Sequence, residues 1–280
     1  MTETVTYTKT LLTIDHVCLN YGDKVILRDV NAEVKEILRN TSKGQVVGFL
    51  GPSGVGKTQL FRIIAGLNKP TSGDVFIYHD MDHQANLKHS VHPGEVGVVA
   101  QSYPLFAHRT VLSNLMRAGA EKCKDEKECK DKVKDYLDEF DLQDKKHLYP
   151  AQLSGGQRQR VAILQQILCS DHFLLMDEPF SGLDMVMLEK TAELIQKVAN
   201  LDELNTIIIV SHDVTSVASV SDHIWLMGRE RNQDNQIIPG ARIVETYNLI
   251  ERDLCWHSNI VLEQRFTDFT REVKLRFRSL

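Results

Sequence analysis

The sequence predicts an α/β fold with a mainly parallel sheet and helices on both of its faces. Two observations support this prediction. Short β-branched and apolar runs alternate with glycines between residues 11 and 101, and strand and helix patterns alternate again from residue 154 onward. Such alternation is typical of a parallel sheet that is covered by helices. Between these two regions the strand pattern disappears, which predicts a helical insertion.

The elements follow in order along the chain. In the first region, strands are predicted at residues 11–14, 45–50, 74–78 and 96–99. A solvated helix is predicted at 121–138, where lysines and acidic residues mix densely. The second region predicts a helix at 159–169, a strand at 173–176, a helix at 187–199 and a strand at 206–210. We therefore divide the chain into an α/β core at 11–101 and 159–235, an inserted helical subdomain at 102–158 and a C-terminal extension at 236–280.

An apolar stripe at helical spacing runs through the C-terminal extension. It consists of Leu262, Phe266, Phe269, Val273 and Phe277. We expect a helix that packs this stripe on the core. A helix that lies on a membrane surface or docks on a partner is the alternative.

Composition excludes several classes of protein. Of the 280 residues, 42% are hydrophobic and 25% are charged, which excludes disordered and collagen-like chains. The net charge of −5 gives no overall attraction to nucleic acid or to an anionic membrane. No apolar run approaches the ~18 residues that cross a bilayer, and the first residues lack the profile of a signal peptide. We therefore expect a cytoplasmic protein.

The five cysteines contain no C-x-x-C pair, and their odd number suits a reducing compartment without a disulfide framework. Cys123 and Cys129 fall within the predicted solvated helix, where their spacing places them on different faces. This argues against a metal shared by the two thiols.

A glycine-rich segment between a predicted strand and a predicted helix matches the pattern G-x-x-x-x-G-K-[ST]. Its residues are Gly51, Pro52, Ser53, Gly54, Val55, Gly56, Lys57 and Thr58. Glycines let backbone N–H groups turn inward around phosphate oxygens, and the helix that follows adds its positive end. We expect Lys57 to bridge the β- and γ-phosphates and the Thr58 hydroxyl to bind Mg²⁺. A glycine-rich turn without a ligand is the alternative.

Two adjacent carboxylates end the apolar strand predicted at 173–176. In a parallel sheet the carboxyl ends of the strands form the ligand crevice. Asp177 is therefore expected to hold Mg²⁺ through water, and Glu178 to polarise an attacking water. The phosphate loop also resembles the start of guanylate kinases, but a kinase has no need of a base for water. This makes a nucleotide kinase the weaker interpretation.

Leu153 is followed by Ser154, Gly155, Gly156 and Gln157, and this pentapeptide resembles the signature of ABC-type ATPases. A serine and two glycines that open a helix present N–H groups and a hydroxyl to an anion. The chain already has one phosphate cradle, so a second anion site implies a second nucleotide. The resemblance implies a head-to-tail dimer, in which each ATP lies between one subunit's phosphate loop and the other's signature segment.

The same resemblance covers about residues 11–235 and implies roles for further residues. Tyr21 matches the aromatic on which adenine stacks, and Gln101 matches a glutamine that contacts Mg²⁺ and the attacking water. Asp184 belongs to a loop that crosses the dimer interface, and His212 matches a switch histidine over the γ-phosphate. ATP and Mg²⁺ are the implied ligands, with the metal held by Thr58, Gln101 and Asp177.

The implied fold is a P-loop NTPase core with a mixed, mainly parallel sheet, an antiparallel β subdomain and an inserted helical subdomain. Three features depart from the family pattern. Residues 31–43 look longer than the usual connection, which predicts an extended loop, and Gln165 and Gln166 stand where many relatives carry Ala-Arg. Four histidines crowd a predicted hairpin, and a solvated hairpin is expected there, with a metal site as the alternative. They are His79, His83, His89 and His92.

The segment after Gln101 points to transport. Residues 103–111 resemble the stretch that importer-type subunits use against their membrane partners. The resemblance therefore implies the separate ATPase subunit of a transporter, an importer of a small polar solute, at the inner face of the cell membrane. The implied partners are a second ATPase subunit, transmembrane permease subunits and a solute-binding protein, with no nucleic acid. A non-transport ABC-type ATPase is the alternative, but such relatives carry a long coiled coil or two ATPase units in one chain.

Overall fold

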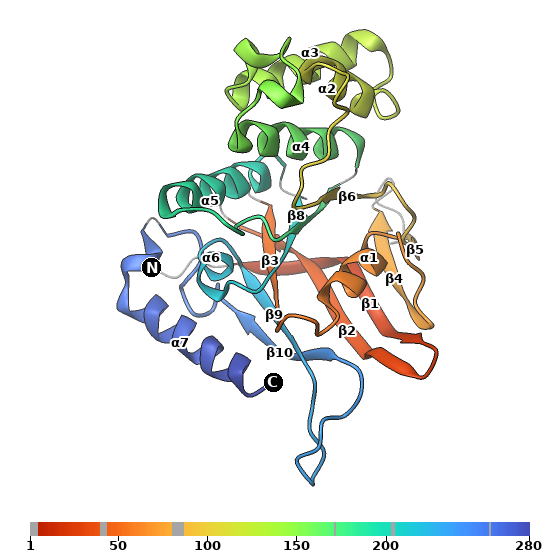
Figure 1. Cartoon of the computed structure of the whole chain (residues 1–280), viewed down its shortest axis with the longest axis vertical. Helices are drawn as coiled ribbons and strands as arrows, with labels where there is room; N and C mark the ends of the chain where they lie inside the picture. The colour runs from red at the N-terminus through yellow and green to blue at the C-terminus, as the bar shows by residue number, and fades with distance from the viewer. Residues whose placement is uncertain (1–4, 40–43, 80–86, 171, 203–204, 258) are drawn as a thin grey trace.

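A computed structural model describes residues 5–39, 44–79, 87–170, 172–202, 205–257 and 259–280 (Figure 1). Its centre is a six-stranded sheet in the order β10-β9-β3-β8-β7-β6. The strands are β3 (Gln45–Leu50), β6 (Val96–Val99), β7 (Phe173–Asp177), β8 (Thr206–Ser211), β9 (His223–Gly228) and β10 (Arg242–Asn248). Only β10 runs antiparallel to its neighbour. The prediction of a mixed, mainly parallel sheet is confirmed.

Continuous apolar runs explain why β3 and β8 lie in the middle of this sheet. Every residue of both strands is buried, as is typical of strands that are covered on both faces. One face packs against α1 (Lys57–Ile64) and the second sheet. The other face packs against the remaining core helices, which are α4 (Gly155–Cys169), α5 (Met185–Ala199), α6 (Val214–Ala218) and α7 (Gln264–Arg278).

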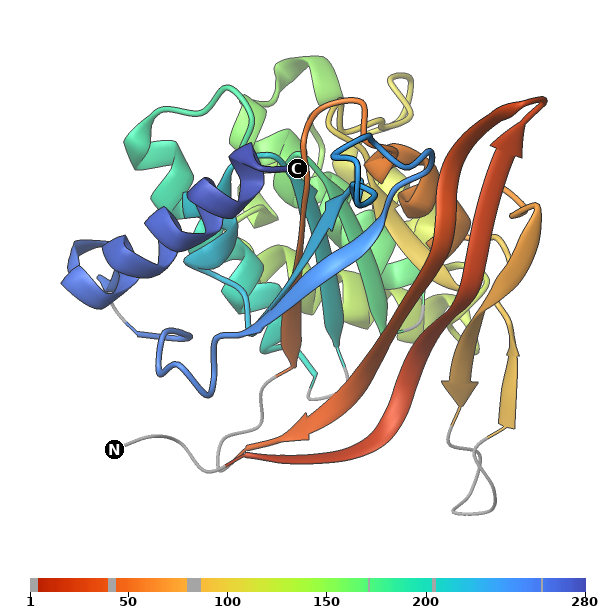
Figure 2. The same cartoon turned by 90° about the horizontal axis from the view of Figure 1, so that it is seen from below.

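The second sheet is antiparallel, four-stranded and ordered β2-β1-β4-β5. Its strands are β1 (Thr6–Tyr21), β2 (Lys24–Leu38), β4 (Ser72–His79) and β5 (Leu87–Ser90). Figure 2 shows β1 and β2 as a long curved hairpin, with α1 between it and the central sheet. This confirms the expected antiparallel β subdomain.

The extended loop expected at residues 31–43 is not observed, because β2 continues to Leu38 and pairs with Thr6 of β1. Val34 is buried in the core beside β1, and Ile37 is buried near the end of the strand. Their burial favours continued pairing with β1 over a solvated loop. Residues 40–43 lie outside the described part of the chain.

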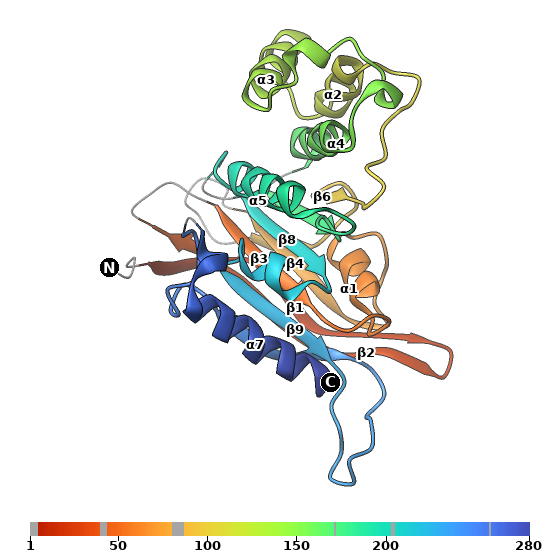
Figure 3. The same cartoon turned by 60° about the vertical axis from the view of Figure 1, so that its left-hand side comes forward.

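The helical insertion contains α2 (Val111–Gly119), α3 (Glu126–Glu139) and two short 3₁₀ turns, Gln143–Lys145 and Pro150–Gln152. Figures 1 and 3 show α2 and α3 at one end of the molecule, beyond α4. The helix predicted at 121–138 begins only at Glu126, because the Asp125 side chain caps it by accepting from the Glu128 N–H at 2.8 Å.

Helix α4, in contrast, begins before the predicted residue 159. Ser154 and Gln157 form a reciprocal capping box that starts the helix at Gly155. The predicted boundary between residues 158 and 159 therefore falls inside a continuous helix. The division of the chain into three segments stays a prediction.

Helix α7 packs its apolar face on the core as expected. Phe266, Phe269 and Val273 are buried, and Phe277 packs at the edge of the same cluster. Leu262 is the exception, because it lies in a 3₁₀ turn before the helix and its residue is 82% exposed. The apolar stripe is therefore shorter than predicted. Within the described residues, no helix combines the length and apolar character that crossing a membrane requires.

Candidate nucleotide site

Four strand ends meet at one edge of the central sheet. The parallel register pairs Leu50 of β3 with Ser211 of β8, and Asp177 of β7 with Val210 of β8. Strand β6 ends beside β7, where Val99 pairs with Met176. Every segment that leaves these ends carries predicted site residues, and carboxyl ends of parallel strands are where such sheets bind ligands.

The phosphate loop turns through two glycines with left-handed backbone. Gly54 has φ 75° and Gly56 has φ 114°, angles that residues with a Cβ rarely adopt. Gly56 is also the N-cap of α1, and among the described residues no side chain caps this helix end. Its first-turn N–H groups therefore have no side-chain acceptor, which suits an anion.

Lys57 folds back over this loop. Its Nζ donates to the carbonyl oxygens of Gly51 at 2.6 Å and Pro52 at 3.0 Å, and the residue is only 8% exposed. Burial lowers the pKa of Lys57, whereas the nearby carboxylates of Glu178 and Asp177 raise it. The ammonium group is therefore held at the loop by two carbonyls and faces two acids.

Asp177 ends strand β7 and is half-buried. Burial raises the pKa of Asp177, Glu178 raises it further, and Lys57 lowers it. Because Mg²⁺ needs an ionised carboxylate and hard oxygen ligands, Asp177 and the Thr58 hydroxyl are a suitable donor set. In the described part of the chain, no group of three or more His, Cys, Asp and Glu side chains could hold a metal. A metal ion here would need phosphate oxygens from the nucleotide, which is how Mg²⁺ is commonly bound.

Glu178 sits at a sharp turn directly after β7. Its backbone has φ 48°, and its N–H donates to the Val210 carbonyl at 2.8 Å, so the side chain folds toward the end of β8. Oε2 accepts from the Ser211 hydroxyl at 2.7 Å, and Oε1 accepts from His212 Nδ1 at 2.7 Å. The predicted base and the predicted switch histidine are therefore hydrogen-bonded to each other.

Tyr21 comes to the same edge from the end of β1. Its hydroxyl donates to Gln59 Oε1 at 2.9 Å and accepts from Asn68 Nδ2 at 3.3 Å. Gln59 is in the first turn of α1, directly after Thr58. With 53% of the residue exposed, the ring can take a base on its face.

Three other groups of predicted site residues are not joined to this cluster within the described residues. Ser154 accepts from the Gln157 N–H at 3.3 Å, and Gln157 Oε1 accepts from the Ser154 N–H at 2.9 Å, so this segment is satisfied locally. Asp184 caps α5 by accepting from the Met187 N–H at 2.9 Å. Gln101 lies exposed in the turn after β6. The roles predicted for these residues stay predictions.

The sequence analysis missed two polar residues that hold other segments in place, Ser211 at the sheet edge and Asn114 in the helical insertion. Ser211 holds Glu178, as described above. Asn114 is completely buried in α2, and its amide accepts from the Phe106 N–H and donates to the carbonyls of Phe106, Arg109 and Thr110. A polar residue on the otherwise apolar buried face of α2 was the available signal for Asn114. Ser211 carried no comparable signal, because its partner comes from another strand.

The cysteine expectation was wrong on one point. Because α3 begins only at Glu126, Cys123 lies in the preceding turn rather than in the helix. Cys129 Sγ donates to the Met116 carbonyl at 3.7 Å, and burial together with the neighbouring Cys123 thiol raises the pKa of Cys129 to about 11. The two thiols are thus neighbours and do not lie on opposite faces.

The histidine cluster is only partly described. His89 Nε2 lies 2.7 Å from Glu95 Oε1, and its ring stacks on that of His92. His83 and the side chain of His79 lie outside the described residues. The expectation of a solvated hairpin stays a prediction. Of the two glutamines that depart from the family pattern, Gln166 accepts from the Val98 N–H of edge strand β6 at 3.0 Å.

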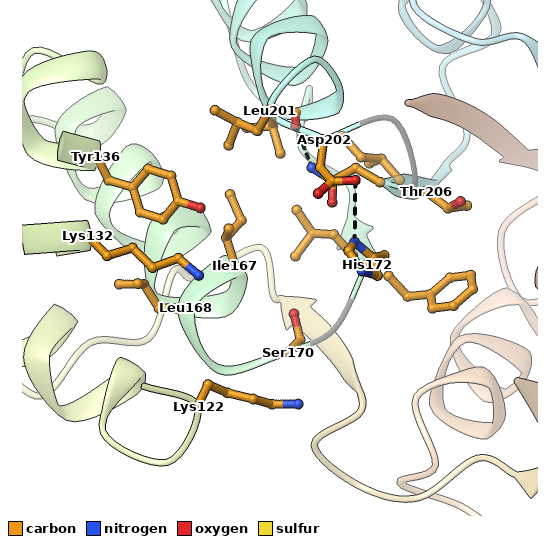
Figure 4. Close-up of a pocket in the computed structure, with 15 residues that line it drawn as sticks. Lys122, Lys132, Tyr136, Ile167, Leu168, Ser170, His172, Leu201, Asp202 and Thr206 are labelled. Carbon is orange, nitrogen blue, oxygen red and sulfur yellow. Dashed lines mark hydrogen bonds and ion pairs between the residues drawn. The ribbon is translucent and has the colours of Figure 1, made fainter. Parts of the chain in front are cut away.

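A cavity of about 300 Å³ lies at the opposite ends of strands β7 and β8 (Figure 4). Lys132 and Tyr136 of α3 face it from one side, and His172 and Asp202, 3.7 Å apart, face it from the other. It adjoins the amino ends of the strands, whereas the phosphate loop is at their carboxyl ends. It is therefore not the nucleotide site.

The fold is that of a phosphate-loop protein, and the candidate nucleotide site lies at the carboxyl ends of the parallel strands of its mixed sheet. The chain belongs to the ABC transporter family, whose model matches residues 34–181. That segment contains the phosphate loop, the signature segment and both adjacent carboxylates, so the resemblance noted in the sequence is confirmed.

Individual proteins with similar sequences or structures support the same family assignment. The L-cystine import ATP-binding protein TcyC of Bacillus subtilis is 33% identical over 253 residues, which cover 87% of this chain and 99% of the relative. The sulfate/thiosulfate import ATP-binding protein CysA of Halalkalibacterium halodurans is 35% identical over 222 residues, covering 78% of this chain and 59% of the relative. This chain therefore matches about three fifths of the length of CysA. The structure of cbiO1 from Clostridium perfringens, part of the ABC transporter complex cbiONQ, has a similar fold, with a TM-score of 0.69, 24% identity and 97% of each chain covered.

Proposed function

We propose that this chain is the ATP-hydrolysing subunit of an importer of a small solute, working at the inner face of the membrane. The observation that carries the proposal is the meeting of Lys57, Asp177, Glu178 and His212 at one sheet edge. A phosphate cradle, a metal-binding carboxylate and a carboxylate base are the parts that hydrolysis of a nucleoside triphosphate needs.

Each residue then has a chemical task. The phosphate loop and Lys57 bind the β- and γ-phosphates, and the ring of Tyr21 stacks on adenine. Thr58, Asp177 and Gln101 would hold Mg²⁺, which would neutralise charge on the phosphate oxygens. Glu178 accepts a proton from the attacking water, and His212 leaves Glu178 to hydrogen-bond the γ-phosphate in the transition state.

The site becomes complete in a head-to-tail pair of subunits. The signature segment, Ser154 to Gln157, opens helix α4 and forms no hydrogen bond to the phosphate loop of its own chain within the described residues. In the pair it faces the γ-phosphate bound by the other copy, and Asp184 lies at the interface. This arrangement makes closure of the pair depend on ATP.

Closure is coupled to membrane subunits through the segment before α2. Asn114 braces this segment through the backbone of Phe106, Arg109 and Thr110, and the Phe106 residue itself is 45% exposed. An exposed aromatic on a rigid backbone suits a protein interface. The names of the relatives refer to import of L-cystine and of sulfate or thiosulfate. This supports import of a small polar solute, and we infer a solute-binding protein as a further partner.

The solution mass of Glu178→Gln tests the proposal. Without the base, bound ATP should persist, so light scattering should report a monomer with Mg·ADP and a stable dimer with Mg·ATP. Glu189→Gln, on the exposed face of α5, is the matched control and should form no persistent dimer with Mg·ATP because it still hydrolyses the nucleotide.

A Glu178→Gln protein that binds ATP and stays monomeric would contradict the shared site. Equal ATP turnover in Glu178→Gln and the wild type would contradict the role of Glu178 as base.

A further inference from the structure

Ser211 is a buried polar residue with a defined partner in the site. It is the last residue of β8, its exposed fraction is 0%, and its hydroxyl donates to Glu178 Oε2 at 2.7 Å. A buried hydroxyl costs free energy unless it is hydrogen-bonded, so this contact is expected to persist. Ser211 therefore ties the end of β8 to the carboxylate that follows β7.

The Ser211 hydroxyl oxygen also makes a second contact, as an acceptor. The backbone N–H of Asp213 donates to Ser211 Oγ at 3.2 Å. Asp213 is itself fixed, because its carboxylate accepts from the Thr215 N–H at 3.0 Å and caps α6. A carboxylate oxygen only accepts, so the single proton of the hydroxyl points to Glu178, while the Asp213 N–H occupies an acceptor position of the hydroxyl oxygen.

The two oxygens of Glu178 are held by partners of different mobility. Oε2 is held by buried Ser211, whereas Oε1 is held by His212, whose side chain is 57% exposed. His212 can leave without opening a packed region, but Ser211 cannot. The carboxylate thus has one anchored oxygen and one oxygen that a side-chain rotation releases.

We propose that Ser211 is a positioning residue for hydrolysis, which anchors Oε2 so that Oε1 is the oxygen that takes the proton from water. This inference rests on the proposed function, because it assigns how the base of that reaction is aimed. The Glu178 backbone, with its N–H on Val210, fixes the near end of the side chain, and Ser211 fixes the far end. When His212 turns to the phosphate, the base keeps its orientation.

The test compares Ser211→Ala and Ser211→Thr with the wild type in the full-length chain. Removing one orienting hydrogen bond should lower kcat for ATP hydrolysis about tenfold, while the Kd for ATP changes less than about twofold, because no contact to nucleotide is lost. Ser211→Thr keeps the hydroxyl and should restore most of the turnover. Ser221→Ala is the matched control, because Ser221 is equally buried but donates to the Val217 carbonyl of α6, and its kcat should be near that of the wild type.

A double variant separates orientation from general damage. If Ser211 acts through Glu178, adding Ser211→Ala to Glu178→Gln should not lower the residual single-turnover rate further. A further tenfold loss in the double variant would overturn the inference. So would equal kcat in Ser211→Ala and wild type, equal losses in Ser211→Ala and Ser211→Thr, or a change confined to KM. Absence of ATP turnover in the wild type would instead overturn the proposed function.

Discussion

The phosphate-loop edge of the core and the signature segment of the helical insertion are both rich in glycine and polar groups, but they differ in their partners. At the core edge, side chains from three separate strand ends meet, with Lys57 near two carboxylates and His212 bonded to Glu178. In the signature segment, Ser154 and Gln157 bond only within their own helical turn among the described residues. From this contrast we infer that the phosphate-loop edge binds and hydrolyses the nucleotide of its own chain. The signature segment is then available to a second copy of the chain.

Ser154→Arg tests this contrast with the largest expected effect. An arginine should block approach of the second copy, so ATP turnover should fall by about 100-fold or more, while the Kd for ATP stays within about twofold. Steady-state hydrolysis and isothermal titration calorimetry measure the two quantities.

The substitution also removes a helix cap, and Asp125→Ala controls for this. It removes the corresponding cap from α3 without touching the signature segment, and its turnover should stay near that of the wild type. A large loss of ATP affinity in Ser154→Arg would break the comparison, because the signature segment would then belong to the same half-site as Lys57.

Lys57→Ala should weaken ATP binding itself, unlike Ser154→Arg, which should lower turnover and leave binding nearly unchanged. It removes the cation held at the phosphate loop, so the affinity for ATP should fall by roughly 30-fold, the effect of losing charge-assisted hydrogen bonds. Calorimetry with ATP measures the change. Lys69→Ala alters an exposed lysine beyond the end of α1 and is the matched control. Near-normal affinity in Lys57→Ala would refute the assignment of the phosphate loop.

The rate at which Cys129 is alkylated tests whether the helical insertion is firmly packed. Burial and the contact with Cys123 raise the pKa of Cys129 to about 11, so at pH 8 little of it is thiolate. Allowing for the higher nucleophilicity of a basic thiolate, alkylation by iodoacetamide should be about 20-fold slower than in the unfolded chain. The rate should rise as the pH approaches 11.

The same cysteine in urea at the same pH is the control, with peptide mass spectrometry as the readout. Equal rates in the folded and unfolded chain would mean that the insertion opens readily. The local hydrogen bonding of Ser154 and Gln157 would then reflect a loosely packed insertion and not the absence of a second subunit.

Tyr21 should give the smallest effect. Tyr21→Ala removes the ring and should weaken ATP binding about fivefold, the scale of one aromatic stacking contact. Tyr21→Phe keeps the ring but loses the hydrogen bond to Gln59, so its affinity for ATP should lie between those of the wild type and Tyr21→Ala. Tyr149→Ala removes an exposed tyrosine of the insertion and should leave ATP affinity unchanged. An unchanged affinity for ATP in Tyr21→Ala would show that the end of β1 does not contribute to nucleotide binding.

Much of the fold could be read from local patterns. The buried runs of β3 and β8, the phosphate loop between β3 and α1, and the apolar face of α7 are all short-range features, which spacing along the chain reveals. The extent of β2 was not readable, because its pairing with β1 depends on a partner strand and on bulges that shift the register. Leu262 was misassigned because spacing cannot show that the chain turns before Gln264.

Local sequence was enough for the order and identity of the phosphate-binding, acidic and signature motifs, because each one is a contiguous stretch whose chemistry depends on its own spacing. Which side chains touch was decided only in three dimensions. The bonds from Ser211 and His212 to Glu178 join the ends of two strands that are more than 30 residues apart in the chain. The contact between Cys123 and Cys129 depends on where α3 begins. Hydrogen bonds act over a few ångströms, so they follow from register and helix termini, which packing of the whole chain determines.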